Sequence, residues 1–152
     1  MSFKKILVAI DSSKTSWIAL YEAIPLAKNL HAKLCIVTVA EEVPTPGYLY
    51  AADLTKYQDK VICNDRNLLE EMQRQVLKED ILAEIILVEN PSTPNNISEK
   101  IIEVVNTWGA DLLVVGTHSR RGVRRFLLGS IAEETLRHSP IPVLLIPSNE
   151  TD

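Results

Sequence analysis

Five short apolar runs alternate along the chain with longer stretches in which apolar side chains recur every three or four positions. The short runs are rich in β-branched residues, a pattern typical of strands buried on both faces of a parallel sheet. The longer stretches have the period of amphipathic helices. The predicted strands are 3–10, 33–40, 83–88, 111–115 and 143–146, and the predicted helices are 13–30, 53–79, 97–108 and 130–138.

Two of the predicted helices carry sequence signals at an end. Gly109 follows the 97–108 helix directly and is expected to be its C-terminal cap. Ser130 is followed three residues later by Glu133, which predicts a capping box at the start of the last helix. Loops are predicted between the elements, including 41–52, which contains two prolines, a glycine and two tyrosines.

The alternation of strands and helices predicts an α/β fold, with a parallel five-stranded sheet and helices on both faces. Right-handed crossovers leave few strand orders, and the usual ones for a doubly wound sheet of this size are 3-2-1-4-5 and 2-1-3-4-5. We expect the order 3-2-1-4-5 and a single domain over residues 1–152. In this order the 143–146 strand lies at an edge of the sheet.

Composition and charge narrow the classes of partner. The 152 residues are 46% hydrophobic and 24% charged, close to the average of soluble globular proteins. A net charge of -4 argues against nonspecific nucleic-acid binding. No apolar run approaches the roughly 18 residues of a membrane span, and the N-terminus lacks a signal-peptide pattern. We therefore expect a cytoplasmic protein that binds neither nucleic acid nor a membrane.

The cysteines and histidines show no spacing that suggests a metal site. Cys35 and Cys63 are too few for a disulfide framework and lack a zinc-binding pattern, so they are expected to be buried or half-buried free thiols. The three histidines have no ligand spacing with one another or with the cysteines. No metal site made by protein side chains alone is expected.

The candidate chemistry lies where the first and fourth strands end. Ligands of open α/β sheets bind beyond the carboxyl ends of the strands at the switch in strand order, here between these two strands. Asp11-Ser12-Ser13 leaves the first strand and Gly116-Thr117-His118-Ser119 the fourth. Three of the five glycines and four arginines lie between Gly116 and Gly129, just before a predicted helix start. Glycines and a helix start together predict a phosphate-binding loop.

The residues alone leave other interpretations open. Glycines after a strand are often simple turn residues, and arginine clusters are often solvated surfaces. Asp11 is also suited to cap the following helix, and His118 is more typical of a loop residue than of a catalytic base. The GxGxxG, GxxxxGK[ST] and GxSxG signatures are absent, as are the clustered carboxylates of a phospho-receiver domain.

Over nearly its whole length the sequence resembles the universal stress protein family. The matching stretches are ILVAIDSS at 6–13, IVTV at 36–39, GADLLVVG at 109–116 and GTHSRRGVRRFLLGSIAEETLRHSPIPVLLIP at 116–147. The ATP-binding branch of the family has the pattern G-x2-G-x9-G-[S/T]. Gly116, Gly129 and Ser130 match it, and Ser119 replaces the middle glycine. If this position needs a positive φ, serine costs roughly 1–2 kcal/mol; otherwise its hydroxyl can donate to a phosphate.

The resemblance implies a role for each matching residue. Asp11 would contact the ribose or adenine side of ATP, and Val39 would offer backbone hydrogen bonds to adenine. The triphosphate would be held by Gly116, Ser119, Gly129 and Ser130, with Mg²⁺ carried by the nucleotide. The strand at 143–146 would pair with its copy in a second subunit, which agrees with an apolar strand exposed at a sheet edge.

These observations favour a cytoplasmic ATP-binding stress protein that acts as a sensor or regulator. The alternative is a dimeric interaction protein of the same fold that binds no nucleotide. A slow ATPase ranks below both, because no paired nucleophile and general base can be identified in the sequence.

Overall fold

The computed structural model describes residues 2–40, 51–89, 97–117 and 129–147, with the backbone alone for 51–54. Four helices and five strands alternate in these ranges, as the sequence pattern predicts. The strands are β1 (Lys5–Ala9), β2 (Lys33–Ala40), β3 (Ala83–Glu89), β4 (Leu112–Gly116) and β5 (Val143–Ile146); the helices are α1 (Lys14–Leu30), α2 (Ala51–Leu77), α3 (Ile97–Trp108) and α4 (Ser130–His138).

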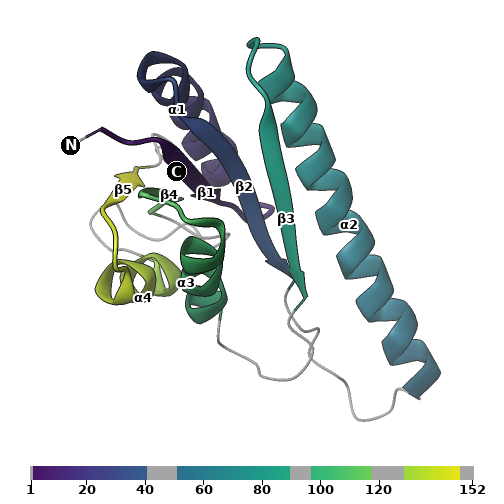
Figure 1. The fold of residues 1–152 in the computed structure, drawn as a ribbon. Coiled ribbons are helices and arrows are strands. Elements are labelled where there is room, and N and C mark those ends of the chain that lie inside the picture. Colours follow the sequence, from purple (N-terminus) through teal and green to yellow (C-terminus); the bar gives the residue numbers. More distant parts are fainter. Residues whose placement is uncertain (1, 41–50, 90–96, 118–128, 148–152) are drawn as a thin grey trace.

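The strands form a parallel sheet in the order β3-β2-β1-β4-β5, which confirms the predicted order (Figure 1). β1 lies in the middle and pairs with β2 on one side and β4 on the other. β3 lies outside β2, and β5 lies outside β4 on the opposite side of the sheet. The switch in strand order therefore lies between β1 and β4.

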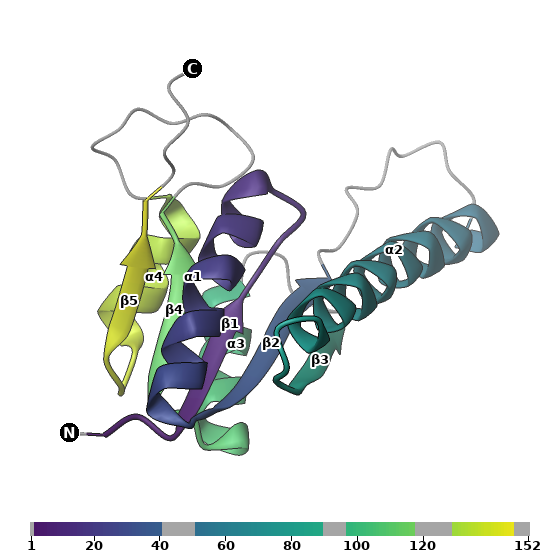
Figure 2. The same ribbon diagram turned by 90° about the horizontal axis from the view of Figure 1, so that it is seen from above.

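Two apolar layers fix the helices on the two faces of the sheet. One layer joins α1 and α2 to alternate residues of the central strands, among them Ile6 and Val8 of β1. The residue between them, Leu7, faces the other layer with α3 and α4. Figures 1 and 2 show the resulting three layers, with the sheet between the two helix pairs. The central strands β1, β2 and β4 are buried on both faces, which explains their nearly continuous apolar sequence, whereas the edge strands β3 and β5 are only partly buried.

Helix α2 is much longer than the strand beside it. Its 27 residues span about 40 Å, whereas the seven residues of β3 span about 23 Å. Leu69, Met72 and Val76 of its C-terminal half are buried against the sheet, while Tyr57 in the N-terminal half is 54% exposed. The helix extends past the end of β3 (Figure 1). Within the described ranges, no helix is both long and apolar enough to cross a bilayer.

The ends of the elements show where sequence signals were right and wrong. Gly109 has a φ of +81° and its N–H donates to Val105 O at 3.1 Å, which confirms the predicted C-terminal cap of α3. The predicted capping box is wrong. Gly129 is the N-cap of α4, with φ -61° and ψ 152°, and Ser130 is the first helical residue. Because Gly129 O already accepts the N–H of Glu133, the helix begins one residue earlier than a serine cap requires.

The two cysteines have different surroundings. Cys35 is buried in β2, whereas Cys63 is exposed on α2, so the expectation that both are at least half-buried is wrong for Cys63. Burial raises the pKa of the Cys35 thiol from 9.0 to about 12, the nearby Glu84 carboxylate adds to the rise, and the Lys5 ammonium opposes it. The thiolate is the reactive form of cysteine, so burial protects Cys35.

We expect one fast-reacting thiol per native chain. At pH 8 a thiol with a pKa of about 12 is ionised in about one molecule in ten thousand. The Cys35 side chain is also fully buried, so a reagent cannot reach it. Titration with a disulfide reagent should consume one equivalent rapidly and the second only after denaturant is added. Cys63→Ser should remove the fast equivalent. Rapid reaction of two thiols in the native protein contradicts the burial of Cys35.

Candidate functional site

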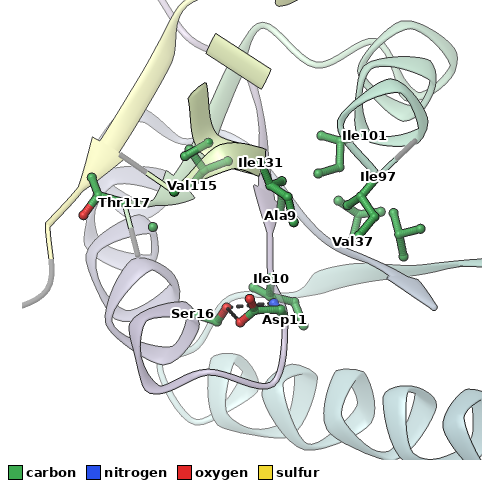
Figure 3. A pocket seen from close by; sticks show the side chains of 14 residues that line it. Ala9, Ile10, Asp11, Ser16, Val37, Ile97, Ile101, Val115, Thr117 and Ile131 are labelled. Carbon is green, nitrogen blue, oxygen red and sulfur yellow. Dashed lines mark hydrogen bonds between the residues drawn. The ribbon is translucent and has the colours of Figure 1, made fainter. Parts of the chain in front are cut away.

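A pocket lies at the carboxyl edge of the sheet, at the ends of β1 and β4. Residues from the ends of three strands and from three helices line it (Figure 3). They are Ala9, Ile10, Asp11, Ser16, Val37, Val39, Ile97, Ile101, Val115, Gly116, Thr117, Gly129, Ile131 and Ala132. The pocket therefore occupies the place at which doubly wound sheets bind ligands.

Asp11 lies two residues after the end of β1, and residues at the start of α1 hold its carboxylate. Its Oδ1 accepts a hydrogen bond from Ser13 N at 2.7 Å. It accepts another from Ser16 Oγ at 2.9 Å (Figure 3). Asp11 is not the cap of α1: Ser13 is the N-cap, and its hydroxyl accepts from Ser16 N. The carboxylate is thus anchored through one oxygen and lines the pocket as a hydrogen-bond acceptor.

Gly116 ends β4 beside the first turn of α1. A Cβ at this position would lie 2.6 Å from Thr15 Cγ2, closer than packed atoms approach. The φ of Gly116 is not in the left-handed region. Packing against Thr15 therefore explains why this position is a glycine, in addition to its place in the pocket wall.

The N-terminus of α4 is held against the ends of β4 and β5. Thr117 N donates to Ile146 O at 3.0 Å, and Gly129 N donates to Thr117 O at 2.8 Å. Within the described residues, no side chain caps α4, because Gly129 is the N-cap. The first N–H groups of an uncapped helix have no intrahelical partner and carry partial positive charge. Gly129 and Ile131 bring this end of α4 to the pocket.

The backbone of Val39 reaches the pocket beyond the end of β1. The last bond between these strands is Ile10 N to Val37 O, at 2.9 Å. Backbone groups alternate in direction along a strand, so the N–H and C=O of Val39 face the same side as those of Val37. Paired residues of β1 and β2 extend only to Ala9 and Val37. In the described part of the chain, the backbone groups of Val39 therefore have no partner from β1.

The remaining wall is apolar and comes largely from α3 and α4. Ile97 and Ile101 project from α3, and Ile131 projects from α4 (Figure 3). Ser98 Oγ donates to Glu134 Oε2 at 2.9 Å and ties the two helices together. Four of the lining residues were not predicted from the sequence to belong to a site: Ile97, Ile101, Ile131 and Ser16. The 3.6-residue pattern of 97–108 predicts which face of the helix points inward. It does not predict which part of that face lines a pocket instead of packing on the sheet.

Of the residues assigned from sequence, Asp11, Val39, Gly116 and Gly129 all line this pocket. Ser130 lies next to Gly129 on the first turn of α4 and is exposed. Ser119 lies outside the described residues, as do His118, Gly122 and the four arginines at 120, 121, 124 and 125. In the described ranges, no three His, Cys, Asp or Glu side chains gather as a metal site.

Comparison with known proteins identifies the family. The model of the universal stress protein family matches residues 2–147. A solved protein of this family from Burkholderia pseudomallei is 32% identical, with a TM-score of 0.74 over 97% of this chain and 98% of that one. The universal stress protein UspA from Lactobacillus plantarum is 20% identical, with a TM-score of 0.82 over 96% and 99% of the two chains, and shares the fold.

Some solved structures similar to this chain contain nucleotides. One universal stress protein in complex with cAMP is 25% identical, with a TM-score of 0.68 over 96% of this chain and 98% of that one. More distant matches are a protein from Archaeoglobus fulgidus with dAMP and one from Arabidopsis thaliana with AMP. The family model covers almost all of the sequence, and the strand order agrees with the solved relatives. The chain is therefore a member of the universal stress protein family.

Proposed function

We propose that the chain binds ATP with Mg²⁺ in the pocket between β1 and β4, and that it acts as a cytoplasmic sensor or regulator in a stress response. One observation carries the proposal: the pocket joins an apolar wall, an anchored carboxylate and an uncapped helix N-terminus. These three features suit the base, the sugar and the phosphates of a nucleotide. Solved relatives that hold cAMP, dAMP or AMP support nucleotides as the ligand class.

The base would occupy the apolar part of the pocket. Val37 and Val39 come from β2, and Ile97 and Ile101 come from α3. A flat heteroaromatic ring buries its faces favourably against such side chains. Adenine also offers an adjacent donor and acceptor at its edge, which the N–H and C=O of Val39 can complement. This supports a purine base, and adenine in particular.

The phosphates would lie at the start of α4. Unpaired N–H groups at a helix N-terminus attract anions. Among the described residues, no side chain caps the N-terminus of α4 by accepting a hydrogen bond there. Ser130 adds an exposed hydroxyl on the same turn. The proposal also assigns Gly116 and Ser119 to this region on the family pattern. Asp11 is the carboxylate in the pocket lining and has the ribose as its proposed partner, so Mg²⁺ would come with the nucleotide.

The residues fit a binding role better than a catalytic one. Hydrolysis needs a group that positions or activates water. Asp11, the ionisable residue among the described lining residues, is already engaged by Ser13 and Ser16 through Oδ1. We therefore propose regulation by the bound nucleotide, with turnover at most slow.

A second proposal is a homodimer formed along β5. This strand ends the sheet at one edge, and in the described part of the chain no strand covers its outer side. Pro142 O and Ile146 O accept hydrogen bonds from the β4 side. By alternation, the N–H and C=O groups of Val143 and Leu145 point to the free edge. Two such edges can pair about a two-fold axis. The same edge supports the alternative of a dimeric interaction protein without a nucleotide.

We expect changes in β5 to weaken the dimer. Val143→Pro removes an outward N–H, and Leu144→Lys places a charge at a position that is 37% exposed. Each change occurs twice in a two-fold dimer, so the dissociation constant should rise at least about tenfold. Leu82→Lys is the control, because Leu82 is 81% exposed and lies before β3. Sedimentation measures the effect. A parent protein that is monomeric at high micromolar concentration contradicts the dimer.

The nucleotide proposal is tested by what the protein carries after purification. Mass spectrometry of small molecules released from freshly purified protein should detect ATP or a product of it. Gly129→Val, purified in the same way, should release much less. Equal amounts from both proteins would place the phosphates away from Gly129. No nucleotide after preparation in the presence of ATP would favour the interaction protein.

A further inference from the structure

We infer that Ser16 is a positioning residue that fixes which oxygen of Asp11 faces the ligand, and thereby sets the preference for a ribose with free hydroxyl groups. This inference rests on the proposed function. Sequence resemblance points to Asp11 but gives Ser16 no role. The structure joins the two residues by a reciprocal pair of hydrogen bonds (Figure 3).

The Ser16 hydroxyl is held in one orientation. Its oxygen accepts the backbone N–H of Asp11 at 2.7 Å, and its single proton is donated to Asp11 Oδ1 at 2.9 Å. Ser16 is only 5% exposed, so water cannot easily replace either bond. The hydroxyl therefore joins the backbone and the carboxylate of the same residue.

The carboxylate of Asp11 needs this support because its terminal torsion is soft. Rotation about the Cβ–Cγ bond of an aspartate has broad minima rather than sharp rotamers. Ser13 N and Ser16 Oγ both donate to Oδ1 and so define the carboxylate plane. Among the described residues, no hydrogen bond reaches Oδ2. This oxygen is left as the acceptor for a ligand donor, and the hydroxyl groups of a ribose are donors of the right kind.

Removing the hydroxyl should have a specific consequence. In Ser16→Ala, Ser13 N alone holds Oδ1, and the carboxylate can turn. Binding of ATP should weaken by about threefold to tenfold, the effect of one lost hydrogen bond. Binding of 2′,3′-dideoxy-ATP should change much less, since it has no sugar hydroxyl to donate. The dissociation constant of 2′,3′-dideoxy-ATP divided by that of ATP should therefore fall toward one.

Two comparisons separate positioning from general stability. Ser13→Ala removes the side chain that caps α1 and so destabilises the helix, but it keeps the backbone N–H of residue 13 that holds Asp11. This variant should lose thermal stability but keep the parent's ratio of the two dissociation constants.

Ser16 also lines the pocket, so an effect through Asp11 must be distinguished from direct contact between Ser16 and the ligand. In an Asp11→Ala background, Ser16→Ala should have little further effect on ATP binding if it acts through Asp11.

Calorimetric titration of both nucleotides into the parent and variants tests the inference. The inference is supported if the parent prefers ATP, Ser16→Ala loses this preference and Ser13→Ala keeps it. A parent that binds ATP selectively while Ser16→Ala keeps the same ratio overturns it and leaves the proposed function standing. A parent that binds neither nucleotide overturns both. If Ser16→Ala does not fold, the nearly isosteric Ser16→Cys, a weak donor, replaces it.

Discussion

Replacing Gly129 with valine should lower the affinity for ATP by about 100-fold while the chain stays folded. The backbone at Gly129 has φ -61° and ψ 152°, which any residue adopts, so conformation does not demand glycine. Gly129 is buried in the pocket wall at the N-terminus of α4. A branched side chain would keep phosphates from the helix N–H groups. Loss of two charge-assisted hydrogen bonds amounts to about 3 kcal/mol, or about 100-fold.

The ligand provides the control for this variant. Adenosine lacks phosphates, so its affinity for Gly129→Val should stay close to that for the parent. Calorimetry gives both constants, and thermal unfolding shows whether the variant is folded. Parental affinity for ATP in folded Gly129→Val would place the phosphates elsewhere. An equal loss for adenosine would point to a collapsed pocket rather than a blocked phosphate site.

Gly116→Ala should destabilise the fold by about 1–3 kcal/mol, the usual cost of overpacking. The new methyl group would lie 2.6 Å from Thr15 Cγ2 and 3.4 Å from Thr15 O. The Thr15 side chain, α1 or the end of β4 must shift to admit it. Because Gly116 itself lines the pocket, ATP binding should weaken as well. Denaturant unfolding measures the change in stability.

Thr15→Ser removes the methyl group in conflict and supplies the second half of a double-mutant cycle. On its own it should cost little, since it deletes one buried methyl group. Combined with Gly116→Ala, it should recover most of the lost stability. Additive effects of the two changes would show that Thr15 does not restrict position 116.

The fold was predictable because its signals are repeated along the whole chain. Each strand is apolar on both faces, and each helix has an apolar stripe, so alternation alone predicts the α/β class. The ends of elements depend on single hydrogen bonds. The serine at 130 looks like a cap, but Gly129 O accepts the bond that begins α4. Likewise, Cys63 is apolar enough to suggest burial, yet it is exposed and, among the described residues, precedes the buried side chains of α2, the first of which is Leu69.

The site was predictable only in part, for a physical reason. Asp11 and Gly116 stand at strand ends, and topology brings strand ends together. Ser16 is five residues away from Asp11, and its role depends on the turn between β1 and α1, which periodicity does not describe. Ile97 belongs to the apolar stripe of the predicted 97–108 helix, and a helix face that lines a pocket has the same pattern as one that packs on a sheet.

Calorimetric titration of the parent protein with ATP and Mg²⁺ tests the central claim most directly. Saturable binding of one ATP per chain is predicted, with weaker binding of ADP and AMP because they make fewer contacts at the start of α4. The thermal midpoint should rise with ATP concentration as linkage requires. No heat and no thermal shift at millimolar ATP would contradict a nucleotide site between β1 and β4.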